Sequence, residues 1–225
     1  MRVARSFAFV DLSGFTAHTE QHGDEEAVAV LASFRATLRE ICSRRAVRIA
    51  KWLGDGAMLV GVDSTPLLSA VLELEHRAAS DPTPMSIRCG VTHGPVILLE
   101  GDDYIGHAVN VAARLCDAAG AGEVLATPAV VPALPPWAAS HGAEEIRIRG
   151  LGQALPIVRL SLGDPGAGAV PDPVCGIPLA QAHAVSGHRH PSPTADGPGA
   201  GGPTRFCSES CLETWRGRNP VPSSD

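Results

Sequence analysis

The feature of the sequence that most constrains its fold is an Asp55-Gly56 pair between two short β-prone runs. The runs cover residues 47–52 and 57–62. An Asp-Gly pair in this setting is a strong signal for a β-hairpin. Helical patterns flank the hairpin: apolar residues recur every three or four positions after Asp24, a good N-cap, and a second helix is expected over 64–79. The chain is therefore predicted to alternate helices with antiparallel strands.

The other periodic segments extend this pattern over the first 162 residues. They predict a strand over 6–10, a strand pair over 86–92 and 96–100, a helix over 106–119, and late strands over 123–126, 146–149 and 155–160. The strand pair is placed around His93-Gly94-Pro95, because Gly and Pro favour turns. This order predicts an α+β sandwich in which helices cover one face of a mostly antiparallel sheet.

Two stretches rich in glycine and proline divide the rest of the chain. Residues 163–173 and 197–203 have no apolar period, which is typical of linkers and disordered inserts. The expected parts are one domain over 1–162, a linker over 163–171, a small cysteine-containing module over 172–220 with a disordered insert, and a tail over 221–225.

Charge and hydropathy exclude several classes of partner. The chain has 18 basic and 24 acidic residues, a net charge of -6 and no cluster of Lys or Arg, so nucleic acid and anionic membranes are not expected partners. No apolar run approaches the roughly 20 residues of a membrane span, and the N-terminal apolar stretch is too short for a signal peptide. We expect a cytoplasmic protein whose six cysteines are reduced thiols or metal ligands.

Two aspartates stand at the ends of predicted strands. Asp11 follows the first strand and Asp55 lies in the hairpin turn, so adjacent strands would bring both to one edge of the sheet. Mg²⁺ and Mn²⁺ prefer oxygen ligands and must keep open positions for phosphate. Each aspartate alone is more simply explained as a turn residue. Together they form a candidate site for a pair of cations.

A polar pair lies on the predicted helix over 106–119. Asn110 and Arg114 are four residues apart and therefore project from the same face. The simpler interpretation is a solvated arginine, but apolar neighbours confine the pair to a narrow polar stripe. A fixed arginine beside an amide suits a phosphorus transition state, in which negative charge spreads over the equatorial oxygens.

Four segments together resemble the class III adenylate/guanylate cyclase catalytic domain, in the order in which that family has them. The segments are Phe9 to Thr16 (FVDLSGFT), Lys51 to Gly56 (KWLGDG), Arg88 to Gly94 (RCGVTHG) and Val109 to Leu115 (VNVAARL). One of them alone is a weak signal, whereas four in order are specific. The resemblance covers about the first 160 residues and implies a ferredoxin-like cyclase sandwich.

The resemblance implies a catalytic site shared between the two chains of a homodimer. Asp11, Asp55 and the Leu12 carbonyl of one chain would hold two Mg²⁺ or Mn²⁺ ions over the triphosphate. Asn110 and Arg114 of the other chain would stabilise the transition state.

The same resemblance implies how the nucleotide is held. Lys51 would reach the purine ring, and Arg149 would contact the terminal phosphates. His107 would occupy the second purine-selecting position, where the family usually has Asp for adenine. A neutral imidazole can accept a hydrogen bond from the adenine amino group, but a protonated imidazole can only donate one.

These features predict an adenylate cyclase that converts ATP to 3′,5′-cyclic AMP and pyrophosphate in intracellular signalling, with guanylate cyclase as the less favoured activity. The alternative is a non-catalytic cyclase homologue that senses nucleotide or metal. A third interpretation, a metal-handling protein acting through its C-terminal part, leaves the polar residues of the first 162 positions unexplained.

The C-terminal part has two short motifs that resemble the ends of a YHS-type domain, a small metal-associated module. These are Asp172 to Gly176 (DPVCG) and Arg205 to Cys211 (RFCSESC). Cys175, Cys207 and Cys211 could hold Zn²⁺ or another soft metal, completed by His183, His188 or His190. The alternative is a degenerate tail with free thiols, because the segment between the motifs has no clear strand.

Overall fold

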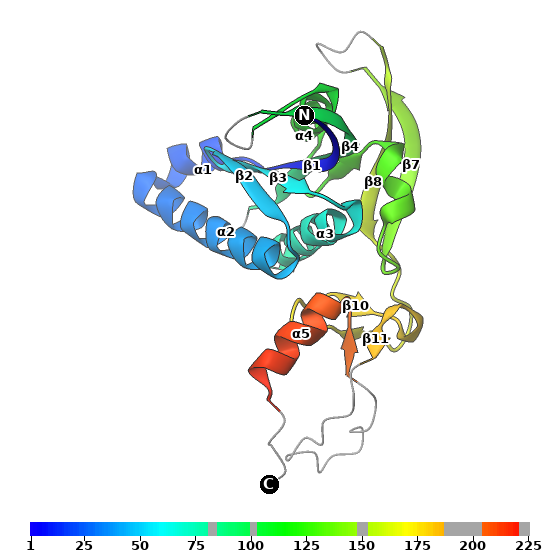
Figure 1. Cartoon of the computed structure of the whole chain (residues 1–225). Coiled ribbons are helices and arrows are strands. Elements are labelled where there is room, and N and C mark those ends of the chain that lie inside the picture. The colour runs from blue at the N-terminus through cyan, green and yellow to red at the C-terminus, as the bar shows by residue number, and fades with distance from the viewer. Residues whose placement is uncertain (81–84, 100–102, 148–152, 187–203, 221–225) are drawn as a thin grey trace. The chain divides into compact units, whose positions relative to one another are not determined.

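The computed structural model describes residues 1–80, 85–99, 103–147, 153–186 and 204–220. The chain divides into two compact units, Met1–Leu162 and Gly163–Asp225, and each is considered by itself (Figure 1). Within the described residues no helix is both long enough and apolar enough to cross a membrane.

The N-terminal unit alternates helices and strands much as the periodicity predicts. Its helices are α1 (Phe15–His22), α2 (Asp24–Arg44), α3 (Ser64–Ser80) and α4 (His107–Ala118), with a 3₁₀ segment at Pro128–Ala133. Its strands are β1 (Arg2–Leu12), β2 (Arg48–Leu53), β3 (Gly56–Gly61), β4 (Ile87–Leu98), β5 (Tyr104–Ile105), β6 (Val124–Ala126), β7 (Ala138–Ile146) and β8 (Leu155–Leu162). The hairpin predicted at Asp55-Gly56 is formed by β2 and β3.

One sheet organises this unit. Its strand order is β2-β3-β1-β4-β6-β8-β7, with β5 paired to β4. All described pairings in this sheet are antiparallel except that of β4 with β6. The central strand β1 pairs with β3 on one side and β4 on the other, and this register places Asp11 between Gly56 and Arg88. The predicted mostly antiparallel α+β fold is confirmed.

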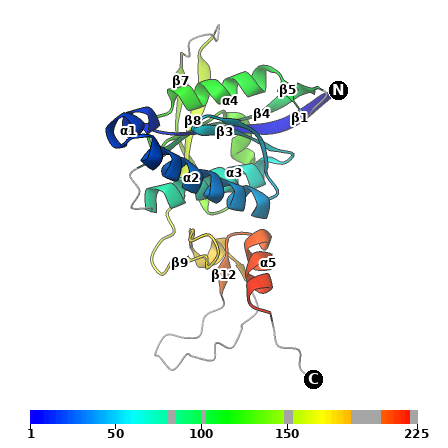
Figure 2. The ribbon, with the colours of Figure 1, turned by 90° about the vertical axis from the view of Figure 1, so that its left-hand side faces the viewer.

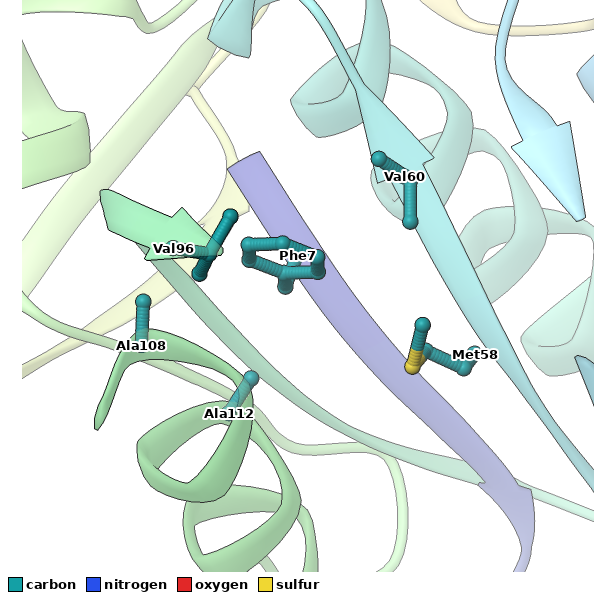
Figure 3. Packing of buried hydrophobic residues seen from close by; sticks show 6 residues of the cluster. All are labelled: Phe7, Met58, Val60, Val96, Ala108 and Ala112. Carbon is teal, nitrogen blue, oxygen red and sulfur yellow. The ribbon is translucent and has the colours of Figure 1, made fainter. Parts of the chain in front are cut away.

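Helices cover both faces of the sheet, which corrects the expected one-sided arrangement. Figure 2 shows α4 on one face and α2 with α3 on the other. The side chains of a strand alternate between faces, so β1 serves two cores: Phe7 packs toward α4 (Figure 3), whereas Leu12 shares a cavity with residues of α2 and α3. The α4-side cluster comprises Phe7, Met58, Val60, Val96, Ala108 and Ala112.

A glycine sets the close approach of α4 to β4. A Cβ atom on Gly90 would lie 2.2 Å from the Ala112 carbonyl oxygen and 2.3 Å from the Cys116 nitrogen. Any side chain at position 90 would therefore push the helix off the sheet. This contact fixes the depth at which α4, with Asn110 and Arg114, lies on the sheet.

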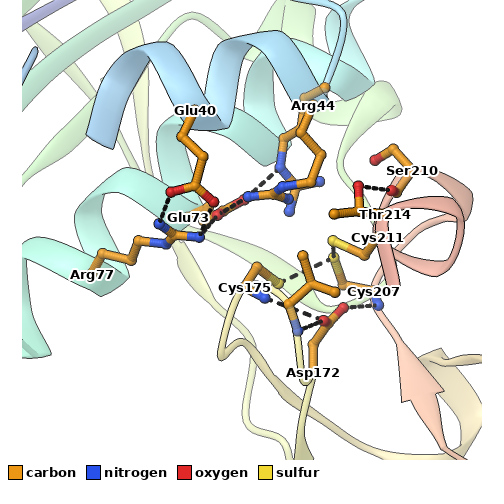
Figure 4. Close-up of polar contacts among 12 residues, drawn as sticks. Glu40, Arg44, Glu73, Arg77, Asp172, Cys175, Cys207, Ser210, Cys211 and Thr214 are labelled. Atoms are coloured by element: carbon orange, nitrogen blue, oxygen red, sulfur yellow. Dashed lines mark hydrogen bonds and ion pairs between the residues drawn. The ribbon is translucent and has the colours of Figure 1, made fainter. Parts of the chain in front are cut away.

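A buried ionic cluster holds α2 against α3. Glu73 on α3 is fully buried and pairs with Arg44 and with Arg45, whose Nε lies 2.7 Å from Glu73 Oε2, at the end of α2. Arg77 contributes a further contact of 2.8 Å to Glu73 and also binds Glu40 (Figure 4). Removing one partner of such a cluster leaves a buried charge uncompensated, so the contact fixes the position of α2.

Two local predictions about strands are wrong. Residues 86–100 do not form a strand pair, because β4 continues through His93-Gly94-Pro95, where Gly94 and Pro95 pair with Arg5 and Ala4. Long-range pairing with β1 overrides the local turn preference. The strand predicted over 146–149 is instead β7, which ends at Ile146, and residues 148–149 lie outside the described residues. Helix α1, which follows Gly14, was not predicted.

The C-terminal unit contains short elements around a small core. These are β9 (Val170–Pro171), β10 (Pro178–Leu179), a 3₁₀ turn (Gln181–His183), β11 (Val185–Ser186), β12 (Arg205–Phe206) and α5 (Glu209–Arg218). Its buried apolar side chains include Ile177, Leu179, Phe206 and Leu212. The predicted disordered insert falls within 187–203, outside the described residues.

Candidate active site

The two predicted metal-binding carboxylates meet at one edge of the sheet. Asp11 is the last residue of β1 that pairs with β3, and its partner Gly56 follows Asp55 of the hairpin turn. Burial raises the pKa of the Asp55 carboxyl, and the negative charge of Asp11, which also contacts it, raises that pKa further. The raised pKa reflects the free energy that it costs to ionise this carboxyl when it is partly buried and close to the Asp11 carboxylate. A divalent cation bound between the carboxylates would remove that repulsion, so the residues fit such a cation.

Glycines shape the turn that carries Asp55. A Cβ atom on Gly56 would lie 2.6 Å from the Val10 carbonyl oxygen and 2.9 Å from Asp11 Oδ1. Gly54, on the other side of Asp55, has a φ of 68°, a left-handed conformation that favours glycine. The two glycines therefore allow the turn to bring Asp55 close to the end of β1.

Arg88, which was not among the predicted site residues, lies beside the carboxylates. Its Nε and Nη2 donate hydrogen bonds to Asp11 Oδ2 at 2.9 and 2.5 Å. The Arg88 side chain is 35% exposed and the Asp11 side chain 20%, so the pair borders solvent. The hydrogen bonds to Asp11 raise the pKa of the Arg88 guanidinium, which stays charged. One permanent cation therefore stands next to the two acidic groups.

Lys51 is paired with Asp103, which was not among the predicted site residues. Its Nζ lies 2.8 Å from Asp103 Oδ1, and both side chains are about half exposed. The contact with Lys51 lowers the pKa of the Asp103 carboxyl. The pair combines hydrogen-bond donors with an acceptor at the surface. That combination can recognise a heterocycle that presents a ring nitrogen beside an amino group.

The polar pair of α4 faces solvent. Asn110 and Arg114 are exposed, and Arg114 Nη1 contacts Asp117 at 3.1 Å. Arg114 lines a hollow of about 470 Å³ between α4 and the strands β6, β7 and β8. No described contact joins Asn110 or Arg114 to Asp11 or Asp55 within the chain. Within one chain the two polar groups therefore share no described direct contact, although Asp117, the partner of Arg114, also acts on Arg88 through its charge.

Of three other predicted positions, the structure describes Leu12 and His107. The Leu12 side chain is buried toward α2 and α3, and the role of its carbonyl stays a prediction. His107 is the exposed first residue of α4, whereas the residue beside Lys51 is Asp103. Arg149 lies outside the described residues.

The predicted metal-binding cysteines of the C-terminal unit lie together. Cys175 Sγ and Cys211 Sγ each lie 3.5 Å from Cys207 Sγ, and all of these side chains are buried (Figure 4). Asp172 completes a group whose possible ligand atoms lie within 4.8 Å of one another. Neither His188 nor His190 is among the described residues.

The N-terminal unit has the fold of the nucleotidyl cyclase domains. It resembles the adenylyl cyclase CyaB from P. aeruginosa with a TM-score of 0.63 and 23% identity, over 72% of this chain and 96% of that one. It also resembles the guanylate cyclase domain of RhGC from Catenaria anguillulae, solved with GTP, with a TM-score of 0.64 and 16% identity, over 72% and 98% of the chains. At these identities the likeness establishes the fold.

The sequence establishes the family. The Adenylate and Guanylate cyclase catalytic domain family matches residues 4–156, and the chain belongs to it. It is similar to a pH-sensitive adenylate cyclase of Mycobacterium tuberculosis (38% identity over 127 residues, 56% of this chain and 32% of the relative). It is also similar to an adenylate cyclase of Streptomyces griseus (32% over 117 residues, 52% and 29%).

An uncharacterised protein of Mycobacterium bovis is 33% identical over 141 residues, 62% of this chain and 37% of that protein. The match thus spans less than two fifths of the length of these three relatives.

Proposed function

We propose that the chain is an adenylate cyclase, which converts ATP to 3′,5′-cyclic AMP and pyrophosphate at a site completed by a second copy. The observation that carries the proposal is the contact between Asp11 and Asp55 beside Arg88, because two opposed carboxylates next to a permanent cation suit a metal–triphosphate complex. Membership of the cyclase family supports it.

Asp11 and Asp55, with the Leu12 carbonyl, are proposed to hold two Mg²⁺ or Mn²⁺ ions. When bound, these ions lower the pKa of the ribose 3′-hydroxyl and neutralise the triphosphate. Once Asp11 serves as a ligand, Arg88 can turn from Asp11 to a phosphate oxygen, since both partners border solvent. The aspartates and Arg88 thus orient the triphosphate, while the 3′-hydroxyl proton leaves to solvent.

Asn110 and Arg114 are proposed to act from the other chain. The 3′-oxygen attacks the α-phosphorus in line, and the bond from that phosphorus to the pyrophosphate oxygen breaks. Arg114 donates hydrogen bonds to the equatorial oxygens as negative charge develops there, and Asn110 orients the ribose. Since no described contact joins these residues to Asp11 or Asp55 within one chain, we propose that a second copy in a symmetric dimer supplies the complementary half.

Lys51 and Asp103 are proposed to select adenine. The Lys51 ammonium donates to a ring nitrogen, and the Asp103 carboxylate accepts from the adenine amino group. Guanine presents a carbonyl oxygen at that position, which would face the carboxylate without a hydrogen. His107 and Arg149, predicted to contact the purine and the terminal phosphates, remain further proposed contacts.

We expect purified protein with Mn²⁺ and ATP to yield cyclic AMP, measured by chromatography, with GTP a poorer substrate. Asp103→Ala removes an acceptor for the adenine amino group and should lower the ratio of kcat/KM for ATP to that for GTP about tenfold. Glu145→Ala, at an exposed acidic position on β7, is the matched control. A wild-type protein that makes mainly cyclic GMP would contradict the base assignment.

We also propose that the C-terminal unit holds a soft metal ion, Zn²⁺ for example, through Cys175, Cys207 and Cys211. Asp172 is better explained as a hydrogen-bond acceptor that joins the two sequence motifs than as a metal ligand. Its Oδ1 accepts hydrogen bonds from the N–H groups of Val174 (2.7 Å) and Cys175 (3.2 Å), and its Oδ2 accepts one from the Cys207 N–H (2.7 Å). The carboxylate thus joins the two sequence motifs and leaves the thiols to bind metal.

Full-length protein should bind one equivalent of Zn²⁺, and Cys207→Ser should abolish stoichiometric binding because Cys207 lies between the other two thiols. Hydrogen bonding to Cys207 and burial raise the pKa of the Cys175 thiol, so metal must displace protons and affinity should fall as pH falls. Cys42→Ser, at a lone buried cysteine, is the control for a Zn²⁺ titration with a chromogenic chelator. Equal binding by Cys207→Ser would contradict the proposed ligand set.

A further inference from the structure

Helix α2 contacts the hairpin that carries Asp55 through two arginines. The guanidinium carbons of Arg35 and Arg39 lie 5.0 and 5.1 Å from the ring centroid of Trp52 on β2. Only Arg35 has a described hydrogen bond to the turn: its Nη2 donates to the Gly54 carbonyl oxygen at 2.9 Å. Both side chains thus contact Trp52, but only Arg35 has a described hydrogen bond to the turn.

The hydrogen bond from Arg35 reaches the peptide unit that adjoins Asp55. The Gly54 carbonyl and the Asp55 N–H belong to the same planar peptide group. The Asp55 carboxylate accepts a hydrogen bond from its own backbone N–H. One rigid peptide therefore links Arg35 on one side to the Asp55 carboxylate on the other.

Arg35 is itself held in place. Its neighbour Phe34 and the next turn's Leu38 are buried, and the Glu73 cluster fixes the end of α2. Arg35 Nε is buried and, among the described residues, has no hydrogen-bond partner. A buried unpaired donor costs free energy. The Arg35 guanidinium therefore donates to the Gly54 carbonyl oxygen although the Nε–H of the same guanidinium has no described partner.

We propose that Arg35 is a positioning residue that holds the metal-binding turn, by fixing the Gly54–Asp55 peptide so that the Asp55 carboxylate faces Asp11. This inference rests on the proposed cyclase function, in which those carboxylates bind the cations. The described contacts of Arg35 are with Gly54 and Trp52 and not with the carboxylates of Asp11 or Asp55, so its removal should weaken cation binding without removing a ligand.

The test compares Arg35→Gln, Arg35→Lys and Arg39→Gln in the full chain. Mn²⁺ binding is measured by electron paramagnetic resonance with 3′-deoxy-ATP, which lacks the attacking hydroxyl, and thermal unfolding checks that each variant is folded. Arg35→Gln should raise the Mn²⁺ dissociation constant about tenfold, the effect of one charge-assisted hydrogen bond. Arg39→Gln should stay within about twofold of wild type, because a solvated stacking contact contributes little. Arg35→Lys should recover part of the loss, since an ammonium can donate to the same carbonyl.

The same variants separate failure of this inference from failure of the proposed function. Equal Mn²⁺ affinity in Arg35→Gln and wild type would overturn the inference, and so would equal losses in Arg35→Gln and Arg39→Gln, which would assign the effect to Trp52. A wild-type protein that binds Mn²⁺ but makes no cyclic nucleotide would overturn the proposed function. Weaker Mn²⁺ binding confined to Arg35→Gln would still support the role of Arg35 in that case.

Discussion

Replacing Asp55 with alanine is expected to lower the rate of cyclic AMP formation by about a thousandfold or more, because loss of a carboxylate ligand removes several kilocalories per mole of transition-state stabilisation. The fold should survive, since Asp55 lies in a partly exposed turn. The burial and the Asp11 charge that raise its pKa even oppose its ionised form there. Initial rates with saturating ATP and Mn²⁺ and a thermal melt measure both quantities.

Asp63→Ala is the matched control for Asp55→Ala, because Asp63 is an exposed aspartate just after the other end of β3. It should retain the wild-type rate. If wild type and both variants made cyclic AMP equally well, Asp55 would not be a metal ligand. If none made a cyclic nucleotide while all bound ATP, the non-catalytic sensor would be the correct interpretation.

Replacing Arg114 with alanine is expected to lower kcat by about a hundredfold to a thousandfold, the usual effect of removing one donor to a developing oxyanion. The KM for ATP should change much less, because the charge that Arg114 stabilises is larger in the transition state than in the bound substrate. Stability should hardly change, since the side chain is 53% exposed and contacts only Asp117 among the ion pairs described.

Arg2→Ala controls for the loss of an exposed arginine from the same unit. A proportional rise in KM with unchanged kcat in Arg114→Ala would mean that Arg114 binds substrate and transition state alike. Its assignment as a transition-state residue would then be wrong.

Local signals in the sequence predicted much of the fold. The Asp-Gly pair specified the β2–β3 hairpin, and apolar spacing located α2, α3 and α4 to within a few residues. The turn predicted from local preference at His93-Gly94-Pro95 is absent, because these residues lie inside β4 and pair with β1. Which helices cover which face of the sheet depends on the alternation of side chains along β1, a strand that is buried on both faces. Phe7 faces α4, whereas Leu12 faces α2 and α3.

The candidate site was predictable where residues belong to short motifs and not where distant segments meet. Asp11 and Asp55 end predicted strands, so their meeting followed from an antiparallel sheet. Arg88 could have been found by extending the β1–β4 register, which places it opposite Asp11. Asp103 meets Lys51 only because β5 folds back on β4, and an acidic segment of that kind has no local signal.

The central claim is that each catalytic site draws residues from two chains, and mixing two inactive variants tests it most directly. Asp55→Ala and Arg114→Ala are co-purified from one cell or unfolded and refolded together, then assayed with Mn²⁺ and ATP. Half of random dimers are mixed, and each mixed dimer has one intact site of two, so activity should return to about a quarter of wild type. If the mixed dimers form, as mass spectrometry would show, yet activity stays at the level of the single variants, the shared site is contradicted.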